Sequence, residues 1–121
     1  MEEVDPVINL RETTLRNNAF RNVIQTEKMS QLVVMSLMKN ENIGYEIHED
    51  IDQFIYIEKG QGWAKVGEIM YVLTPGVSIF IPRGTYHDII NGNTSDMKLF
   101  TIYSPPHHEE YTYQQFKPIS D

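Results

Sequence analysis

The sequence is divided into short apolar segments by closely spaced turn-forming residues, and this pattern constrains the fold more than any other feature. Glycine, proline, asparagine or aspartate interrupts the chain about every 8–12 residues, and no helical period extends beyond a turn or two. Short strands at this spacing predict an all-β sandwich or barrel. The expected strands are 20–26, 31–38, 45–48, 53–57, 63–66, 69–73, 77–81, 87–90, 97–103 and, as a final edge strand or docked tail, 111–116.

The length of 121 residues fits one domain with a core of its own. We expect the barrel to occupy residues 20–116. Residues 1–19 are mixed in character, with a short turn or helical turn expected at 13–18, and we assign them to an N-terminal arm. Residues 117–121 are expected to be a tail.

The charge and the residue types exclude several classes of protein. The net charge of −7 disfavours binding to nucleic acid and to anionic membranes. The absence of cysteine excludes disulfides, thiolate-bound zinc and a cysteine nucleophile. The first residues are acidic, unlike those of a signal peptide, and every apolar run is too short to span a bilayer. We therefore expect a cytoplasmic protein that binds neither nucleic acid nor membrane.

The stretch 44–62 contains three side chains that can bind a metal ion. Glu46 and His48 are two residues apart, so on a β-strand they lie on one face. A polar run rich in turn formers follows, and strand-like sequence resumes at Gln53. If the chain reverses in that run, Gln53 begins an antiparallel partner strand opposite the other two. A convincing site needs a fourth ligand, for which His87 is the candidate.

A second pattern, Gly76-x5-Pro82-x-Gly84-x2-His87-x3-Asn91, places five residues at fixed offsets. In this spacing the chain resembles the second motif of the cupin superfamily.

The stretch 44–62 in turn resembles the first cupin motif, which carries His-x-His, a glutamate four or five residues on and a closing glycine. Here Glu46 takes the place of the first histidine and Gln53 that of the usual glutamate. This variant is similar to small single-domain cupins with a type-2 conserved barrel, which are often labelled mannose-6-phosphate isomerase-like. The resemblance covers about residues 20–110.

The resemblance implies a double-stranded β-helix, or jelly roll, with one divalent transition metal near the centre of the barrel. Two imidazoles, one carboxylate and one amide oxygen suit Mn, Fe(II), Co, Ni or Zn. The resemblance also implies a homodimer that exchanges or pairs N-terminal strands, a role that residues 1–19 could serve. The alternative is that the two substitutions have dismantled the site and left a polar pocket. The implied ligands are Glu46, His48, Gln53 and His87.

Further candidates for the site lie outside the two motifs. His108 follows a Pro-Pro pair and is the candidate catalytic residue, as a proton shuttle at the mouth of the barrel; a solvated tail segment is the alternative. No cluster of lysine and arginine that would bind a sugar phosphate is present, and Arg83 and Lys98 are the nearest candidates. We expect one or two aromatic residues to line the pocket and the rest to pack, from the set Tyr56, Trp63, Phe80, Tyr86 and Tyr103.

Three functions remain open at this point. The main hypothesis is a metal-dependent cupin that acts on or binds a small polar metabolite, either a carbohydrate or an organic acid. The metal would polarise a substrate oxygen as a Lewis acid and support isomerisation or proton transfer. The second is a noncatalytic sensor or ligand-binding module, and the third is an Fe(II) dioxygenase. Cupins support all three, and the fold does not choose among them.

Overall fold

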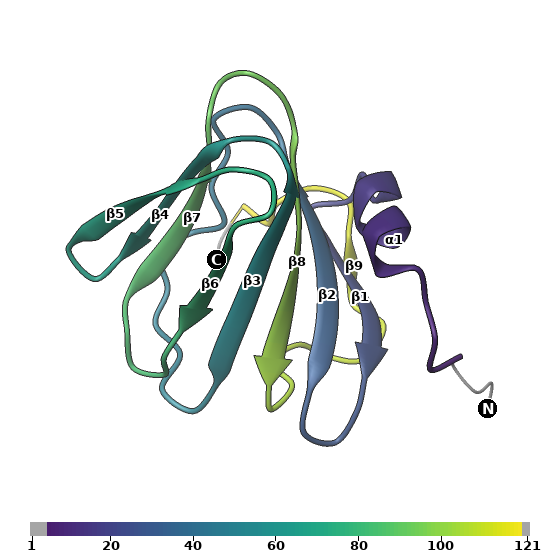
Figure 1. Ribbon diagram of the computed structural model, residues 1–121. Helices are drawn as coiled ribbons and strands as arrows, with labels where there is room; N and C mark the ends of the chain where they lie inside the picture. The colour runs from purple at the N-terminus through teal and green to yellow at the C-terminus, as the bar shows by residue number, and fades with distance from the viewer. Residues whose placement is uncertain (1–4, 120–121) are drawn as a thin grey trace.

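The computed structural model describes residues 5–119, which form two antiparallel β-sheets and one short helix (Figure 1). The larger sheet has six strands in the order β6-β3-β8-β2-β1-β9, and the smaller has three in the order β5-β4-β7. The elements are α1 (Leu10–Arg16), β1 (Arg21–Thr26), β2 (Gln31–Leu37), β3 (Asp52–Lys59), β4 (Gly62–Val66), β5 (Ile69–Leu73), β6 (Ser78–Ile81), β7 (His87–Asn91), β8 (Met97–Ser104) and β9 (Tyr113–Gln114).

The chain passes repeatedly from one sheet to the other. After β3 in the larger sheet, β4 and β5 belong to the smaller one, β6 returns to the larger, β7 to the smaller and β8 to the larger. Figure 1 shows the two sheets facing each other, with β4, β5 and β7 grouped to one side. This winding is the jelly roll, and the predicted all-β fold class is confirmed.

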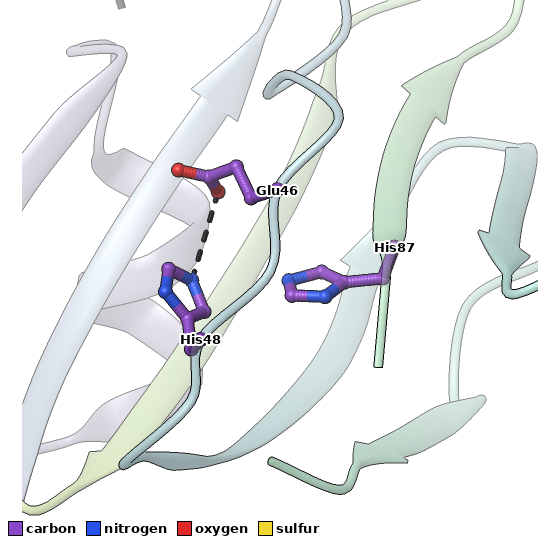
Figure 2. Close-up of side chains that lie close together, drawn as sticks. All are labelled: Glu46, His48 and His87. Carbon is purple, nitrogen blue, oxygen red and sulfur yellow. Dashed lines mark ion pairs between the residues drawn. The ribbon is translucent and has the colours of Figure 1, made fainter. Parts of the chain in front are cut away.

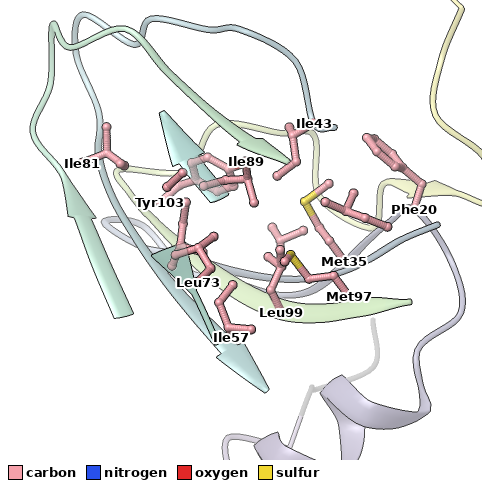
Figure 3. Packing of buried hydrophobic residues seen from close by; sticks show 14 of the residues in the cluster. Phe20, Met35, Ile43, Ile57, Leu73, Ile81, Ile89, Met97, Leu99 and Tyr103 are labelled. Carbon is pink, nitrogen blue, oxygen red and sulfur yellow. The ribbon is translucent and has the colours of Figure 1, made fainter. Parts of the chain in front are cut away.

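The core lies between the two sheets and is filled by alternate residues of the strands. Burial alternates along β3, where Ile55 and Ile57 face inward. Leu73 and Ile89, from the smaller sheet, belong to the same cluster, and Figure 3 shows side chains from both sheets converging. Each aliphatic side chain that is fully buried contributes about 1.5–3 kcal/mol relative to an exposed one. This packing fixes how the two sheets, and the site residues that they carry, face each other.

The predicted hairpin that pairs 45–48 with 53–57 is wrong. β3 pairs with β6 and β8, whereas 45–48 is extended and makes a single bridge, from Glu46 to His87 of β7. The residues before it also follow β7, since the Ile43 N–H donates to the Ile89 carbonyl at 3.0 Å. In a jelly roll the polar run after His48 carries the chain across to the other sheet. The run therefore connects the two sheets and does not fold the chain back on itself.

The Gly-x-Gly sequence at 60–62 is required by close packing of backbones. A Cβ on Gly62 would lie 2.1 Å from the backbone oxygen of Ile90, and one on Gly60 would lie 2.8 Å from that of Asp96. Only glycine allows these approaches without displacing the neighbouring strands.

The N-terminal segment contains more helix than expected. α1 begins at Leu10, because the Asn9 side chain caps it by accepting from the Glu12 N–H at 3.0 Å. The helix contacts β8, β3 and β2 of the larger sheet, and Arg11 lies 3.8 Å from Glu58 of β3. In the described part of the chain, no helix is long and apolar enough to cross a membrane. Residues 1–4 lie outside the described part, and pairing of the arm with a second copy stays a prediction.

The C-terminal segment forms the edge of the larger sheet that is farthest from β6. β9 pairs with β1, as expected for an edge strand, although it is shorter than 111–116. Beyond it, Lys117 Nζ donates to Asn42 Oδ1 at 3.0 Å, so the tail is docked on the barrel as far as this contact. The last two residues of the predicted tail, 120–121, lie outside the described part.

Candidate metal centre

The two sequence motifs are joined through their backbones. The Glu46 N–H donates to the His87 carbonyl at 2.8 Å, and the His87 N–H donates to the Glu46 carbonyl at 2.9 Å. The His48 carbonyl accepts from the Gly84 N–H at 2.7 Å. Gly84 has a φ of +78°, which glycine adopts without the strain that a side chain would introduce. Gly84 of the second motif therefore fixes His48 of the first.

Three of the four predicted metal ligands converge on one point. The ligand atoms of Glu46, His48 and His87 all lie within 4.8 Å of one another. In Figure 2, Glu46 and His48 project from one extended segment, and the His87 ring points toward them from β7. Glu46 Oε1 lies 3.8 Å from His48 Nε2, which is too long for a hydrogen bond. These separations are close to those that bonds of about 2.0–2.2 Å to one shared ion produce.

The His87 ring is oriented by a backbone carbonyl. Its Nδ1 lies 2.9 Å from the Thr85 carbonyl oxygen, which can only accept, so Nδ1 carries a proton and, in the neutral ring, Nε2 carries the lone pair. His87 is only 3% exposed, and Nε2 is buried without a hydrogen-bond partner among the described residues. A ring held in one tautomer by a carbonyl, with its other nitrogen free, is the usual arrangement of a histidine that binds metal.

His48 is uncharged at neutral pH. Burial, which disfavours the imidazolium, lowers its pKa to about 4, and repulsion from His107 and His87 adds to the effect. Its Nε2 is also buried without a hydrogen-bond partner in the described structure. The ring can therefore bind a metal ion at neutral pH without first losing a proton.

Gln53 reaches the interior from the larger sheet. Its Nε2 donates to Thr101 Oγ1 at 3.0 Å, and its Oε1 is buried with no hydrogen-bond partner among the described residues. Because Thr101 engages the nitrogen, the oxygen is the atom available to a ligand. Gln53 lies beside Tyr103 in the β3–β8 register, and the Tyr103 ring is 6.1 Å from that of His48. The assignment of Gln53 as the fourth ligand stays a prediction.

These residues fit a divalent metal ion. Nε2 of His48, Oε1 of Gln53 and Nε2 of His87 are three buried polar atoms that the described structure leaves without hydrogen bonds. Such atoms are rare in folded proteins and cost about 1–3 kcal/mol each, so a ligand shared by the two imidazoles is the expected explanation for their free nitrogens. The N/O donor set matches the transition metals that the resemblance implied.

The structure places His107, rather than His108, against the metal centre. The centroid of the His107 ring lies 4.4 Å from that of His48, closer than the His87 ring at 5.3 Å. The His108 ring lies 4.6 Å from that of His107. His107 is exposed and His108 is half-buried; partial burial is the main cause that lowers the pKa of both, to about 3 for His108, so both rings are uncharged at neutral pH. The role of His108 as a proton shuttle stays a prediction, and His107 is a neighbour of the site that the sequence analysis missed.

Gln31 anchors this histidine pair. Its Oε1 accepts from the backbone N–H groups of His107 and His108 at 3.1 and 3.0 Å, and its Nε2 donates to the His108 carbonyl at 2.8 Å. Gln31 is 1% exposed at the start of a mostly apolar strand, and this polar residue next to an apolar run was the available signal in the sequence. The 107–108 segment is therefore docked on the barrel and is not a solvated tail.

Among the aromatic residues considered for the pocket, Tyr103 contacts a metal-centre residue, with its ring 6.1 Å from that of His48. It is 2% exposed, and burial raises the pKa of its hydroxyl above the ordinary range. Tyr56 stacks on Phe100 at 5.3 Å between ring centroids, and the other candidates, Trp63, Phe80 and Tyr86, are exposed.

The two candidates for phosphate binding contact residues outside the Glu46–His48–His87 cluster. Arg83 is exposed and pairs with Asp52 at 3.3 Å. Lys98 is buried, where its Nζ donates to the Asn17 carbonyl and to Asn18 Oδ1, and burial lowers its pKa.

Two curated proteins are similar to the chain over most of its length. The uncharacterized protein L612 of Acanthamoeba polyphaga mimivirus is 51% identical over 106 residues, which are 84% of this chain and 66% of that protein. The uncharacterized protein YrkC of Bacillus subtilis is 38% identical over 117 residues, 92% of this chain and 63% of that protein. The chain thus spans slightly less than two thirds of the length of either relative.

Structural comparison gives the same relationship. The crystal structure of BH2720 from Bacillus halodurans matches with a TM-score of 0.91 and 35% identity, over 93% of this chain and 91% of that one. The Cupin domain family model matches residues 33–103, a range that includes Glu46, His48, Gln53 and His87. The chain belongs to the cupin family.

Proposed function

We propose that the chain is a metal-dependent cupin that acts on a small polar metabolite at the centre of its barrel. The observation that carries the proposal is the convergence of Glu46, His48 and His87, with a buried and unpartnered nitrogen on each imidazole. These three residues, with Gln53 as the fourth, would hold the ion. Bound there, a divalent ion supplies Lewis-acid polarisation of a substrate oxygen.

The chain's own residues determine the charge of this centre and which groups in it can hold or accept a proton. Glu46 is the one anionic side chain in the set, so a divalent ion there retains positive charge and favours an anionic or hydroxyl-rich ligand. Thr85 holds the proton on His87 Nδ1. The uncharged His107 ring, beside His48, can accept a proton, and His108 is the second candidate for that role.

The reaction that best matches these parts is isomerisation or proton transfer on a carbohydrate or organic acid. We further propose that the protein is a cytoplasmic homodimer whose partner molecules are small metabolites. The mannose-6-phosphate isomerase-like label gains no support from Arg83 or Lys98, since both cations have other partners.

Elemental analysis of untagged protein, purified without chelators, tests the proposal. We expect about one transition-metal ion per chain, bound by the four ligands. Iron would direct the next assays to oxygen uptake, and zinc or manganese to isomerase and lyase activities. Protein that contains no metal, and shows no thermal shift with Mn, Fe, Co, Ni or Zn, would contradict the proposal and favour a noncatalytic binding module.

A further inference from the structure

Strand β5 forms an open edge of the smaller sheet. That sheet has the order β5-β4-β7, so within residues 5–119 β5 has a paired strand on one side only. Figure 1 shows β5 at the outer margin of the molecule, far from α1 and β9. The backbone N–H and C=O groups along the free side of an edge strand have no partner in their own sheet, and another strand can pair with them.

The other three sheet edges are covered or short. β7, the second edge of the smaller sheet, is followed by the segment 41–46, whose backbone bridges it at two places. In the larger sheet, β9 has two residues, and β6 has four and ends directly before Pro82. Proteins commonly protect sheet edges by such short strands, prolines or covering segments. In the described part of the chain, the five-residue strand β5 has none of these protections.

The sequence of β5 is apolar and uncharged throughout. The exposed fractions of its first four side chains, from Ile69 to Val72, are 57, 51, 46 and 69%. The register with β4 runs unbroken along the strand, whereas the β1–β2 and β3–β8 pairs contain register shifts. A regular, exposed and apolar edge strand pairs readily with a further strand. We therefore expect β5 to be covered in solution.

A second copy of this chain fits this edge. A two-fold axis perpendicular to the sheet makes two identical strands antiparallel and keeps the outer faces of both copies on the same side. In the register centred on Tyr71, that residue opposes its own counterpart. Met70 then opposes Val72 of the second copy, and Ile69 opposes Leu73 of the second copy. Every residue of β5 thus has an apolar partner on its own face of the sheet, so the strand is self-complementary.

The distribution of charge also favours a second copy at this edge. The chain carries a net charge of −7, so the approach of two copies is opposed wherever their carboxylates meet. β5 has no charged residue, and in this register the neighbouring Glu68 would oppose Thr74 of the second copy, not another carboxylate. Two acidic copies can therefore pair along β5 without opposing like charges. The strand offers no charge that would select a basic or an acidic partner.

We propose that β5 pairs with β5 of a second copy, antiparallel and centred on Tyr71, so that three strands from each copy form one continuous sheet. The inference deepens the homodimer proposed above by naming its interface, which involves neither the N-terminal arm nor the metal ligands. The interface is linked to the metal centre through β4, where Val66 opposes His87. Pairing along β5 would support the sheet that carries this histidine.

Two variants at the two-fold axis test the register. Tyr71→Lys and Tyr71→Glu each place like charges directly opposite one another, so each should raise the dissociation constant of the dimer by at least about tenfold. An equimolar mixture of the two variants places opposite charges there and should form heterodimers. Sedimentation equilibrium measures the wild type, each variant and the mixture. The proposal is overturned if both variants dimerise like the wild type, or if mixing them restores no association.

Phe80→Lys is the matched control. Phe80 is also an exposed aromatic residue on an edge strand, but it belongs to β6 of the larger sheet. This variant should dimerise like the wild type, and an equal loss of dimer in Phe80→Lys and Tyr71→Lys would refute the assignment to β5. Circular dichroism shows whether each variant is folded.

Amide hydrogen exchange of the unsubstituted protein gives a test that does not depend on any variant. Amides on the free side of β5 should exchange more slowly at millimolar than at micromolar protein concentration, because pairing protects them. Amides of β6 should exchange at the same rate at both concentrations. Protein that is monomeric throughout this range, or a dimer in which β5 gains no protection, would overturn the proposal.

The interface and the metal centre can fail separately. Metal content is measured on the wild type and on Tyr71→Lys. A metal-loaded monomer refutes the interface and leaves the metal-dependent function in place. A metal-free dimer that Tyr71→Lys dissociates supports the interface and contradicts that function. A dimer that persists in both Tyr71 variants retains the homodimer and refutes this interface.

Discussion

Glu46 and His87 hold each other by two reciprocal backbone hydrogen bonds, although they belong to different motifs far apart in the sequence. This pairing puts a carboxylate and an imidazole on adjacent extended segments, and His48 follows two residues later on the same face as Glu46. The geometry of the metal centre is therefore built into the backbone before any ion binds. Binding should reorganise the protein little.

Glu46→Gln should weaken metal binding more than a carboxylate-to-amide substitution of any other acidic residue in this segment. The substitution removes the negative charge of the ligand set while keeping the size of the side chain. We expect a loss of affinity of at least about 10–100-fold, the range seen when even residues that orient a metal ligand are changed. Glu49→Gln is the control, since Glu49 is exposed and lies outside the cluster. Competition with a fluorescent chelator measures both, and similar affinities in the two variants would remove Glu46 from the ligand set.

His87→Ala should yield protein without tightly bound metal. The ring supplies a buried nitrogen whose direction is set by Thr85. His107→Ala is the matched control, because His107 contacts His48 but is not part of the three-residue cluster. Metal content per chain after identical purification checks the prediction, which fails if His87→Ala retains the metal of the wild type.

Gln53→Leu should affect the metal-free and the metal-bound protein differently. In the metal-free protein it removes a buried unpaired oxygen together with one hydrogen bond to Thr101, so we expect a change within about 1 kcal/mol. With metal present, the variant should show a smaller rise in melting temperature than the wild type, because one ligand is lost. Thermal unfolding with and without metal measures both effects. An undiminished rise would show that the ion is held by Glu46, His48 and His87 alone.

The metal-free protein should lose stability as the pH falls below neutrality, in part through His108. Its pKa in the folded protein is about 3, below the ordinary histidine value of 6.5, so the unfolded chain takes up a proton that the folded chain does not bind. The free energy of unfolding therefore decreases as the pH falls from 6.5 toward 3. Denaturant unfolding at a series of pH values should give a shallower decrease for His108→Asn.

Part of this acid sensitivity should remain in the variant. The pKa of His48 is also lowered, to about 4. His48 therefore also decreases the free energy of unfolding as the pH falls from 6.5 toward 4. Identical pH profiles for the wild type and His108→Asn would mean that His108 is not buried in solution as it is in the structure.

The fold class could be predicted from the sequence because its causes are local. The alternation of apolar and polar residues and the regular turn signals specify short strands wherever they occur, and nearly all the expected strands are present. The identities of Glu46, His48 and His87 were likewise accessible, because metal-binding side chains at fixed offsets from glycine and proline are visible in one dimension.

The pairing of segments could not be predicted in the same way. A period of two determines which residues share a face, but it does not determine which strand lies alongside. The hairpin expected between 45–48 and Gln53 was plausible locally, yet the winding of the jelly roll placed 45–48 on β7 and Gln53 between β6 and β8. Gln53 faces the interior because of that winding and not because of a turn.

By itself, then, the sequence determined the strands, the faces of those strands and the identity of the candidate metal ligands, because each depends on patterns of residues near one another in the chain. Only the tertiary structure decided that Glu46 pairs with His87 and that Gln31 docks His107 and His108. Those relationships depend on burial and on contacts between distant segments, which exist only once the two sheets have closed around the core.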